Sequence, residues 1–153
     1  MTRVLIVLLS ALMVLGGAAV AAPIDKSEIL VIEGDWIRIR HKPPDARLLG
    51  FNAPEVLRAQ CRKEKAYGTK AARRLREIVR AGNLDFVSLA CPCAPGTEGT
   101  KACNGGRRCG RLKANGRDVG SILIEEKLAV AFNCSETSCP RTPRPWCKAM
   151  GLR

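Results

Sequence analysis

The chain has 153 residues, a length that suits one domain with a single hydrophobic core, and its 26 Lys and Arg outnumber its 14 Asp and Glu to give a net charge of +12. A charge of this sign favours a polyanionic partner: nucleic acid, an anionic membrane surface or a cell-wall polymer. The single histidine, His41, excludes nucleases that use a histidine pair as acid and base, and most enzymes with a histidine-containing metal site.

The N-terminal segment has the pattern of a secretory signal peptide. Arg3 is followed by an apolar run, Val4 to Leu15, which only Ser10 interrupts, and then by paired glycines and a series of small residues. Pro23 would block cleavage directly before it, so we expect a cleaved signal peptide at 1–21 and a single mature domain at 22–153. The alternative is an uncleaved anchor, because the same apolar segment is barely long enough to span a bilayer. The expected location is the periplasm or the medium, with no stable membrane association after cleavage.

The mature part contains an even number of cysteines, which in an exported protein indicates disulfide bonds. Zinc binding is the competing interpretation, but no Cys-x-x-Cys pair occurs and the histidine lies far from the cysteines. Eight cysteines permit 105 pairings, and the sequence does not choose among them. The residues are Cys61, Cys91, Cys93, Cys103, Cys109, Cys134, Cys139 and Cys147.

The apolar pattern of the mature chain predicts an α+β domain made mainly of strands. In chain order we expect strands at 29–32, 36–40, 46–51, 84–89 and 111–114, a turn at 41–45, and helices at 66–81 and 120–127. Gly82 is a natural stop for the first helix. Three strands, a helix and two strands suit a five-stranded OB-type barrel, with the first helix between strands three and four. A cysteine-stapled loop at about 91–109 and a cysteine-rich tail at about 133–153 complete the domain.

Residues that carry chemistry gather around the third expected strand. Asp35 follows the first apolar run, and the stretch Arg47-Leu-Leu-Gly-Phe-Asn-Ala-Pro-Glu55 reads as a buried strand with a cation at its start and a carboxylate past its end. Arg111 comes later, in a Gly-Arg pair. Phosphodiester hydrolysis needs such groups, because a phosphate must be neutralised, a water deprotonated and a metal held by oxygen ligands. Taken singly, each residue also has an ordinary interpretation as a turn aspartate, a solvated arginine or a surface glutamate.

The order Gly-Asp, then Arg-Leu-Leu-Gly-x-x-x-Pro-Glu, then Gly-Arg resembles the staphylococcal nuclease (thermonuclease) family, over about residues 29–132. The resemblance implies an OB-type barrel and a secreted, calcium-dependent nuclease that acts on DNA or RNA, and we expect a monomer. It implies that Arg47 and Arg111 clamp the scissile phosphate and that Glu55 is the general base. It also implies a calcium site, and the residues matching its ligands are Asp35, Asn52 and Ala53.

The chain departs from the family pattern at the metal site and in the tail. Asn52 stands where the family more often has aspartate, so an oxygen ligand is kept and a full negative charge is lost. Ala53, where threonine is frequent, still offers its carbonyl, and Glu33 could restore some charge. A cysteine-rich tail replaces the usual last helix. The alternative functions are therefore a catalytically weakened nucleic-acid-binding barrel and, behind it, a cysteine-stapled structural or inhibitory protein.

Overall fold

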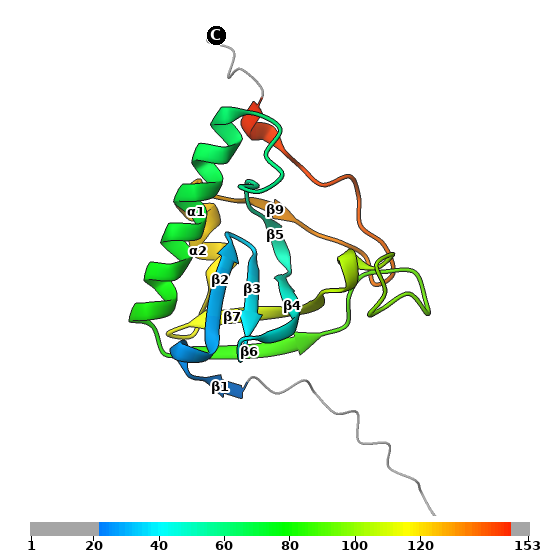
Figure 1. The fold of residues 1–153 in the computed structure, drawn as a ribbon, viewed down its shortest axis with the longest axis horizontal. Coiled ribbons are helices and arrows are strands. Elements are labelled where there is room, and N and C mark those ends of the chain that lie inside the picture. Colours follow the sequence, from blue (N-terminus) through cyan, green and yellow to red (C-terminus); the bar gives the residue numbers. More distant parts are fainter. Residues whose placement is uncertain (1–21, 148–153) are drawn as a thin grey trace, which may run out of the picture.

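The structure, a computed structural model, describes residues 22–147 (Figure 1). The signal peptide expected at 1–21 and the last residues of the tail, 148–153, lie outside the described residues. The expected α+β organisation, mainly strands with two α-helices, is confirmed for the described part. The strands are β1 (Ala22–Ile24), β2 (Ile29–Glu33), β3 (Trp36–Ile39), β4 (Lys42–Leu48), β5 (Gly50–Asn52), β6 (Leu84–Leu89), β7 (Arg108–Ala114), β8 (Arg117–Asp118) and β9 (Val130–Phe132), and the helices are α1 (Arg62–Ala81) and α2 (Val119–Glu125).

The strands form one large sheet and one small one. The large sheet has the order β1-β6-β7-β4-β3-β2, with β8 added to β7, and β5 pairs separately with β9. Strands β4 and β7 are parallel, whereas the other pairs are antiparallel. These pairings describe open sheets, so closure into a five-stranded barrel remains an expectation from the sequence.

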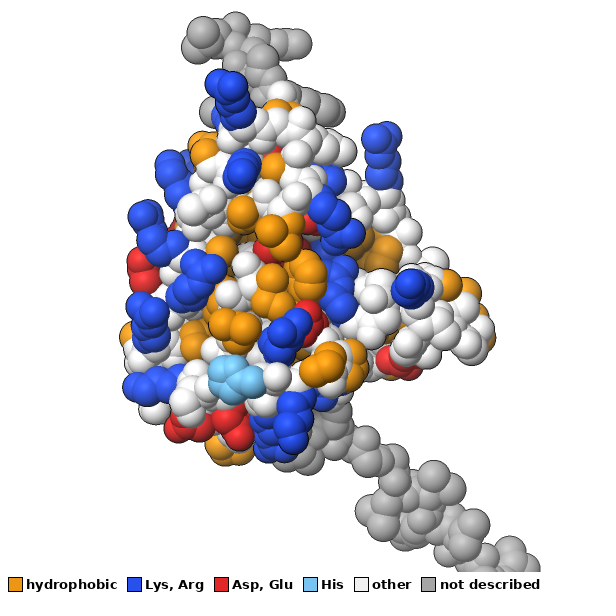
Figure 2. All heavy atoms as spheres, in the orientation of Figure 1, with side chains coloured by type: hydrophobic (Ala, Val, Ile, Leu, Met, Phe, Trp, Pro, Cys, Tyr) orange, Lys and Arg blue, Asp and Glu red, His pale blue; other side chains and the backbone are white. Residues whose placement is uncertain are grey.

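Helix α1 packs its apolar face against β2 and leaves a basic face to solvent (Figures 1 and 2). Its inward residues include Ala71, Leu75 and Ile78, which belong to the main hydrophobic core. The helix begins at Arg62, four residues before the expected start, because its first turn is mostly charged and carries no apolar signal. It ends before Gly82, as predicted.

The turn expected at 41–45 is wrong in its position. Arg40 and His41 make the turn, with left-handed φ values of 54° and 55°, and β4 already begins at Lys42. The strand tolerates Pro43 and Pro44 because residues 43–45 form a bulge opposite the single residue Arg38. Within a bulge the regular hydrogen-bond ladder is interrupted, so the backbone N–H that proline lacks is not needed. The segment from 46 to 51 is also divided, since the chain bends at Gly50, whose φ is 95°, and β5 leaves the large sheet.

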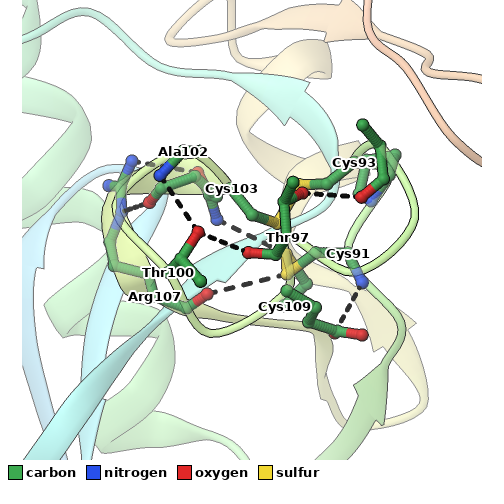
Figure 3. The surroundings of a disulfide bond; sticks show 12 residues. Cys91, Cys93, Thr97, Thr100, Ala102, Cys103, Arg107 and Cys109 are labelled. Atoms are coloured by element: carbon green, nitrogen blue, oxygen red, sulfur yellow. Dashed lines mark hydrogen bonds between the residues drawn. A yellow bond between two sulfur atoms is a disulfide. The ribbon is translucent and has the colours of Figure 1, made fainter.

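Four disulfide bonds use all eight cysteines, which confirms the disulfide prediction. Two of them, Cys91–Cys109 and Cys93–Cys103, staple the loop between β6 and β7 (Figure 3). Cys134–Cys139 closes a small ring in the tail, and Cys61–Cys147 ties the tail to the start of α1. Such a number of disulfides is compatible with an extracytoplasmic protein. Within residues 22–147, neither helix combines the length and the apolar character that crossing a bilayer requires.

Candidate functional site

The structure brings together four of the residues selected from the sequence. Asp35 lies in the tight turn between β2 and β3, and Trp36 next to it pairs with Arg47 of β4. The Arg47 Nη2 atom lies 3.0 Å from Asp35 Oδ2 and donates a hydrogen bond of 2.7 Å to Asn52 Oδ1. The backbone N–H of Ala53 donates to Asp35 Oδ2 at 3.1 Å. Asp35 thus binds the turn both to the Arg47 guanidinium and to the segment that follows β5.

The side chains of Asp35 and Asn52 are buried, with little access to solvent. Asp35 and Asn52 are 5% and 1% exposed. Burial raises the pKa of the Asp35 carboxyl, although the charge of Arg47 and the Ala53 N–H act in the opposite direction. The neighbours of Asp35 therefore offset only part of the cost of burying its charge, and an additional cation beside it would stabilise the ionised form.

Glu55 follows the buried Pro54 and has an unusual environment for a carboxylate. Its Oε2 atom is buried and has no hydrogen-bond partner among the described residues, and Arg58 Nε is 3.7 Å away. Burial raises the pKa of Glu55, and the negative charges of Glu33 and Asp35 raise it further. Arg58 forms an ion pair with this oxygen and acts in the opposite direction on the pKa, but it donates no hydrogen bond. The oxygen therefore keeps its capacity to accept a proton, and its raised pKa makes it a better base than an ordinary glutamate.

Two buried carboxylates fix the backbone that carries Glu55. Glu33 Oε1 accepts hydrogen bonds from the N–H groups of Val56 and Leu57 at 2.8 and 2.9 Å. Glu64, which is 0% exposed, accepts from the N–H of Gln60 at 2.7 Å. Glu33 is thus engaged with the main chain, and its expected contribution to a metal site is limited to its charge.

A second arginine near this cluster, Arg107, was not selected from the sequence. It is half-buried and lies with its guanidinium carbon 5.0 Å from the centre of the Trp36 ring. Its Nε and Nη2 atoms donate to the carbonyl and side-chain oxygens of Asn104 at 2.9 and 3.0 Å. Burial lowers the pKa of Arg107, and the positive charge of Arg47 adds to this, whereas Asp35 has the opposite effect. Arg107 therefore lies within electrostatic reach of the cluster.

Arg111 lies farther along β7, opposite Val87 of β6, and its side chain is exposed. It lines a hollow with Leu49 and Phe132. Among the described residues it makes no hydrogen bond or ion pair with the Asp35 cluster. The parallel pairing of β4 with β7, which sets Arg108 beside Ala46, decides which arginine reaches the cluster. A parallel ladder between strands far apart in the sequence has no local signal, so the motif alone could not separate Arg107 from Arg111.

The oxygen atoms around Asp35 are of the type that a hard cation prefers, and two of them, Asp35 Oδ2 and Asn52 Oδ1, already contact Arg47. Within residues 22–147 no three Asp, Glu, His or Cys side chains are arranged as a ready-made metal site. A cation here would depend on Asp35, the side-chain oxygen of Asn52, the carbonyl of Ala53 and water. A nearby cation would lower the raised pKa of both carboxyls, Asp35 and Glu55, because it would stabilise their ionised forms.

Comparison with known proteins adds no family to this geometry. Neither the protein-family models nor the curated proteins compared with the chain match it. The resemblance to the thermonuclease family therefore depends on the sequence motifs alone.

Proposed function

We propose that this protein is an extracytoplasmic nuclease that hydrolyses phosphodiester bonds of DNA or RNA on an OB-type, thermonuclease-like scaffold. The observation that carries the proposal is Glu55, a carboxylate with a buried oxygen that has no hydrogen-bond partner, within electrostatic reach of Asp35 and of the half-buried Arg107. A protein that only binds nucleic acid needs positive charge but has no use for such a base.

In this mechanism Arg47 and Arg107 bind the scissile phosphate from two elements, β4 and the stapled loop. Their guanidinium groups neutralise the charge that builds up on the phosphate oxygens as the water oxygen bonds to phosphorus. Glu55 accepts the proton of that water, and the bond from phosphorus to the leaving oxygen breaks. The leaving oxygen takes a proton from solvent. Asp35 and Asn52 hold Arg47 in place until the phosphate arrives.

Calcium is the cation that we propose for the oxygen atoms of Asp35, Asn52 and Ala53. When bound, it would supply positive charge to the phosphate and lower the pKa of a coordinated water. Asp35 is the one carboxylate of this set, so we expect weaker calcium binding than two carboxylates would give.

One observation favours the alternative, a weakened nucleic-acid-binding protein. The Nη2 atom of Arg47 already contacts both Asp35 and Asn52, so part of its capacity to bind phosphate is used inside the protein. The basic face of α1 would attract nucleic acid in either case (Figure 2).

Digestion of denatured DNA by the oxidised protein, with added calcium and with a chelator, separates the two functions. The nuclease proposal predicts cleavage that calcium supports and the chelator suppresses. Binding of the same DNA without any cleavage in calcium would leave the alternative.

A further inference from the structure

The segment Cys134–Cys147, which we name the C-terminal strap, is anchored beside the candidate site. Arg144 donates to Glu64 from Nε and Nη2 at 2.9 Å each, and also to the carbonyl of Arg58 at 2.9 Å. The disulfide between Cys61 and Cys147 fastens the end of the strap next to the same buried glutamate. In Figure 1 the strap, drawn in orange to red, runs from the stapled loop back to the first turn of α1.

The pKa of the Glu64 carboxyl agrees with a firm anchor. Burial opposes its ionisation, but the hydrogen bonds from Arg144 and from the Gln60 N–H outweigh burial and lower the pKa. The carboxylate thus stays charged and bonded to the strap at neutral pH. Removal of Arg144 would leave a buried charge with one fewer partner, which is costly.

The strap also reaches the site itself, through Asn52. The Nδ2 atom of Asn52 donates to the carbonyl of Pro143 at 3.0 Å, while its Oδ1 accepts from Arg47 at 2.7 Å. Only an amide satisfies both neighbours, since a carboxylate can accept from the arginine but has no proton for the carbonyl. The same requirement fixes which end of the amide is oxygen.

We propose that Asn52 is a positioning residue that transmits the hold of the C-terminal strap to Arg47, and that the strap thereby orders the phosphate-binding arginine. This inference rests on the proposed function. It also explains why asparagine stands at this position. Compared with aspartate, asparagine lacks the negative charge that favours a metal ion, but its amide N–H links β5 to the strap 91 residues later. In this role Asn52 acts through Arg47, in addition to the place of its oxygen in the proposed calcium site.

A double-mutant cycle tests the link at saturating calcium. Asn52→Asp keeps the acceptor for Arg47, removes the donor to Pro143 and adds a negative charge, and saturating calcium keeps a change in calcium affinity out of kcat. The triple variant Cys61→Ser, Cys147→Ser and Arg144→Gln removes both anchors and opens the strap. We expect Asn52→Asp to lower kcat about tenfold in the closed protein, with KM changed less than about twofold, and to have little effect once the strap is open. Equal effects in the closed and open proteins, or a higher kcat for Asn52→Asp, would overturn the inference.

A second measurement does not depend on activity. The NMR order parameter S² of the Arg47 side-chain N–H should fall from about 0.8 to about 0.6 or below when the strap is opened. Arg74, which is bonded to Glu126 away from the strap, is the matched control and should not change. If the wild type cleaves no DNA, the proposed function fails, and the Arg47 measurement alone decides the inference. Unchanged order at Arg47 would refute it.

Discussion

The candidate site has two halves that are built in different ways. Asp35 and Arg47 are brought together by the turn before β3 and the pairing of β3 with β4, and Asn52 of β5 joins them through a short hydrogen bond to Arg47. Arg107 and Pro143 arrive from segments without regular structure that disulfides close. The strand half is held by the hydrophobic core, whereas the stapled half depends on covalent links. The chemistry that we propose needs both halves, so its activity should depend on oxidation more than the fold does.

The largest expected effect concerns the second arginine that binds the phosphate. The geometry assigns this role to Arg107 of the stapled half, whereas the family motif assigns it to Arg111 of β7. Arg47→Ala and Arg107→Ala should each lower kcat/KM on the order of a hundredfold, because the charge of the transition state then goes unmatched. The family motif assigns the same loss to Arg111, which is exposed on β7. From the geometry we expect Arg111→Ala to cost about threefold or less, as a surface cation that attracts the substrate. A larger loss for Arg111→Ala than for Arg107→Ala would restore the assignment by motif.

Opening the stapled loop should have a smaller effect on the same arginine. The variant Cys91→Ser with Cys109→Ser frees a loop closed over a separation of 18 residues, and Arg107 lies inside it. We expect kcat to fall about tenfold well below the melting temperature, since a mobile Arg107 spends less time at the phosphate. The variant Cys134→Ser with Cys139→Ser opens a ring with a separation of only 5 residues and serves as the control. Equal activity of the two variants would show that the loop has no part in positioning.

The smallest expected effect is on stability and concerns Glu55. Burial raises the folded pKa of Glu55 above the ordinary 4.5, so folding is penalised as pH rises through the window from 4.5 to the raised value, and the penalty is complete above that value. Below this window both states are protonated and the penalty is absent. Glu55→Gln should therefore raise the melting temperature by about 3 °C at pH 7 and change it little at pH 3. A lower melting temperature at pH 7 would mean that the charged carboxylate is stabilised in the fold.

Much of the strand half could be predicted from the sequence. The strand from Leu84 to Leu89 and the stop at Gly82 are where the pattern put them. The alternation of apolar residues marks strands whose two faces differ, and a glycine after an apolar helix face marks its end. Asp35, Arg47 and Asn52 lie close in the sequence, and the turn at Arg40 and His41 folds β4 back onto β3, which brings Arg47 beside Asp35. Local signals of this kind are visible in a sequence.

The stapled half could not be predicted in the same way. Nothing local indicates that Asn52 meets Pro143, because a hydrogen bond to a carbonyl over 91 residues leaves no periodic trace. Arg107 is one of many basic residues in the sequence, which do not stand out from one another. Its position depends on contacts with Trp36 and Asn104 and on the parallel pairing of β4 with β7. The even number of cysteines predicted disulfides, but the pairing that shapes this half needed the fold.

The measurement that tests the central claim most directly is the cleavage of denatured DNA by oxidised wild-type protein and by Glu55→Gln, with calcium present. The substitution keeps the size of the side chain and removes its ability to take a proton. We predict that the wild type cleaves and that Glu55→Gln is slower by about a thousandfold, while both bind the DNA equally. Equal cleavage rates for the two proteins would contradict the assignment of Glu55 as the base, and with it the account of this cluster as a nuclease site.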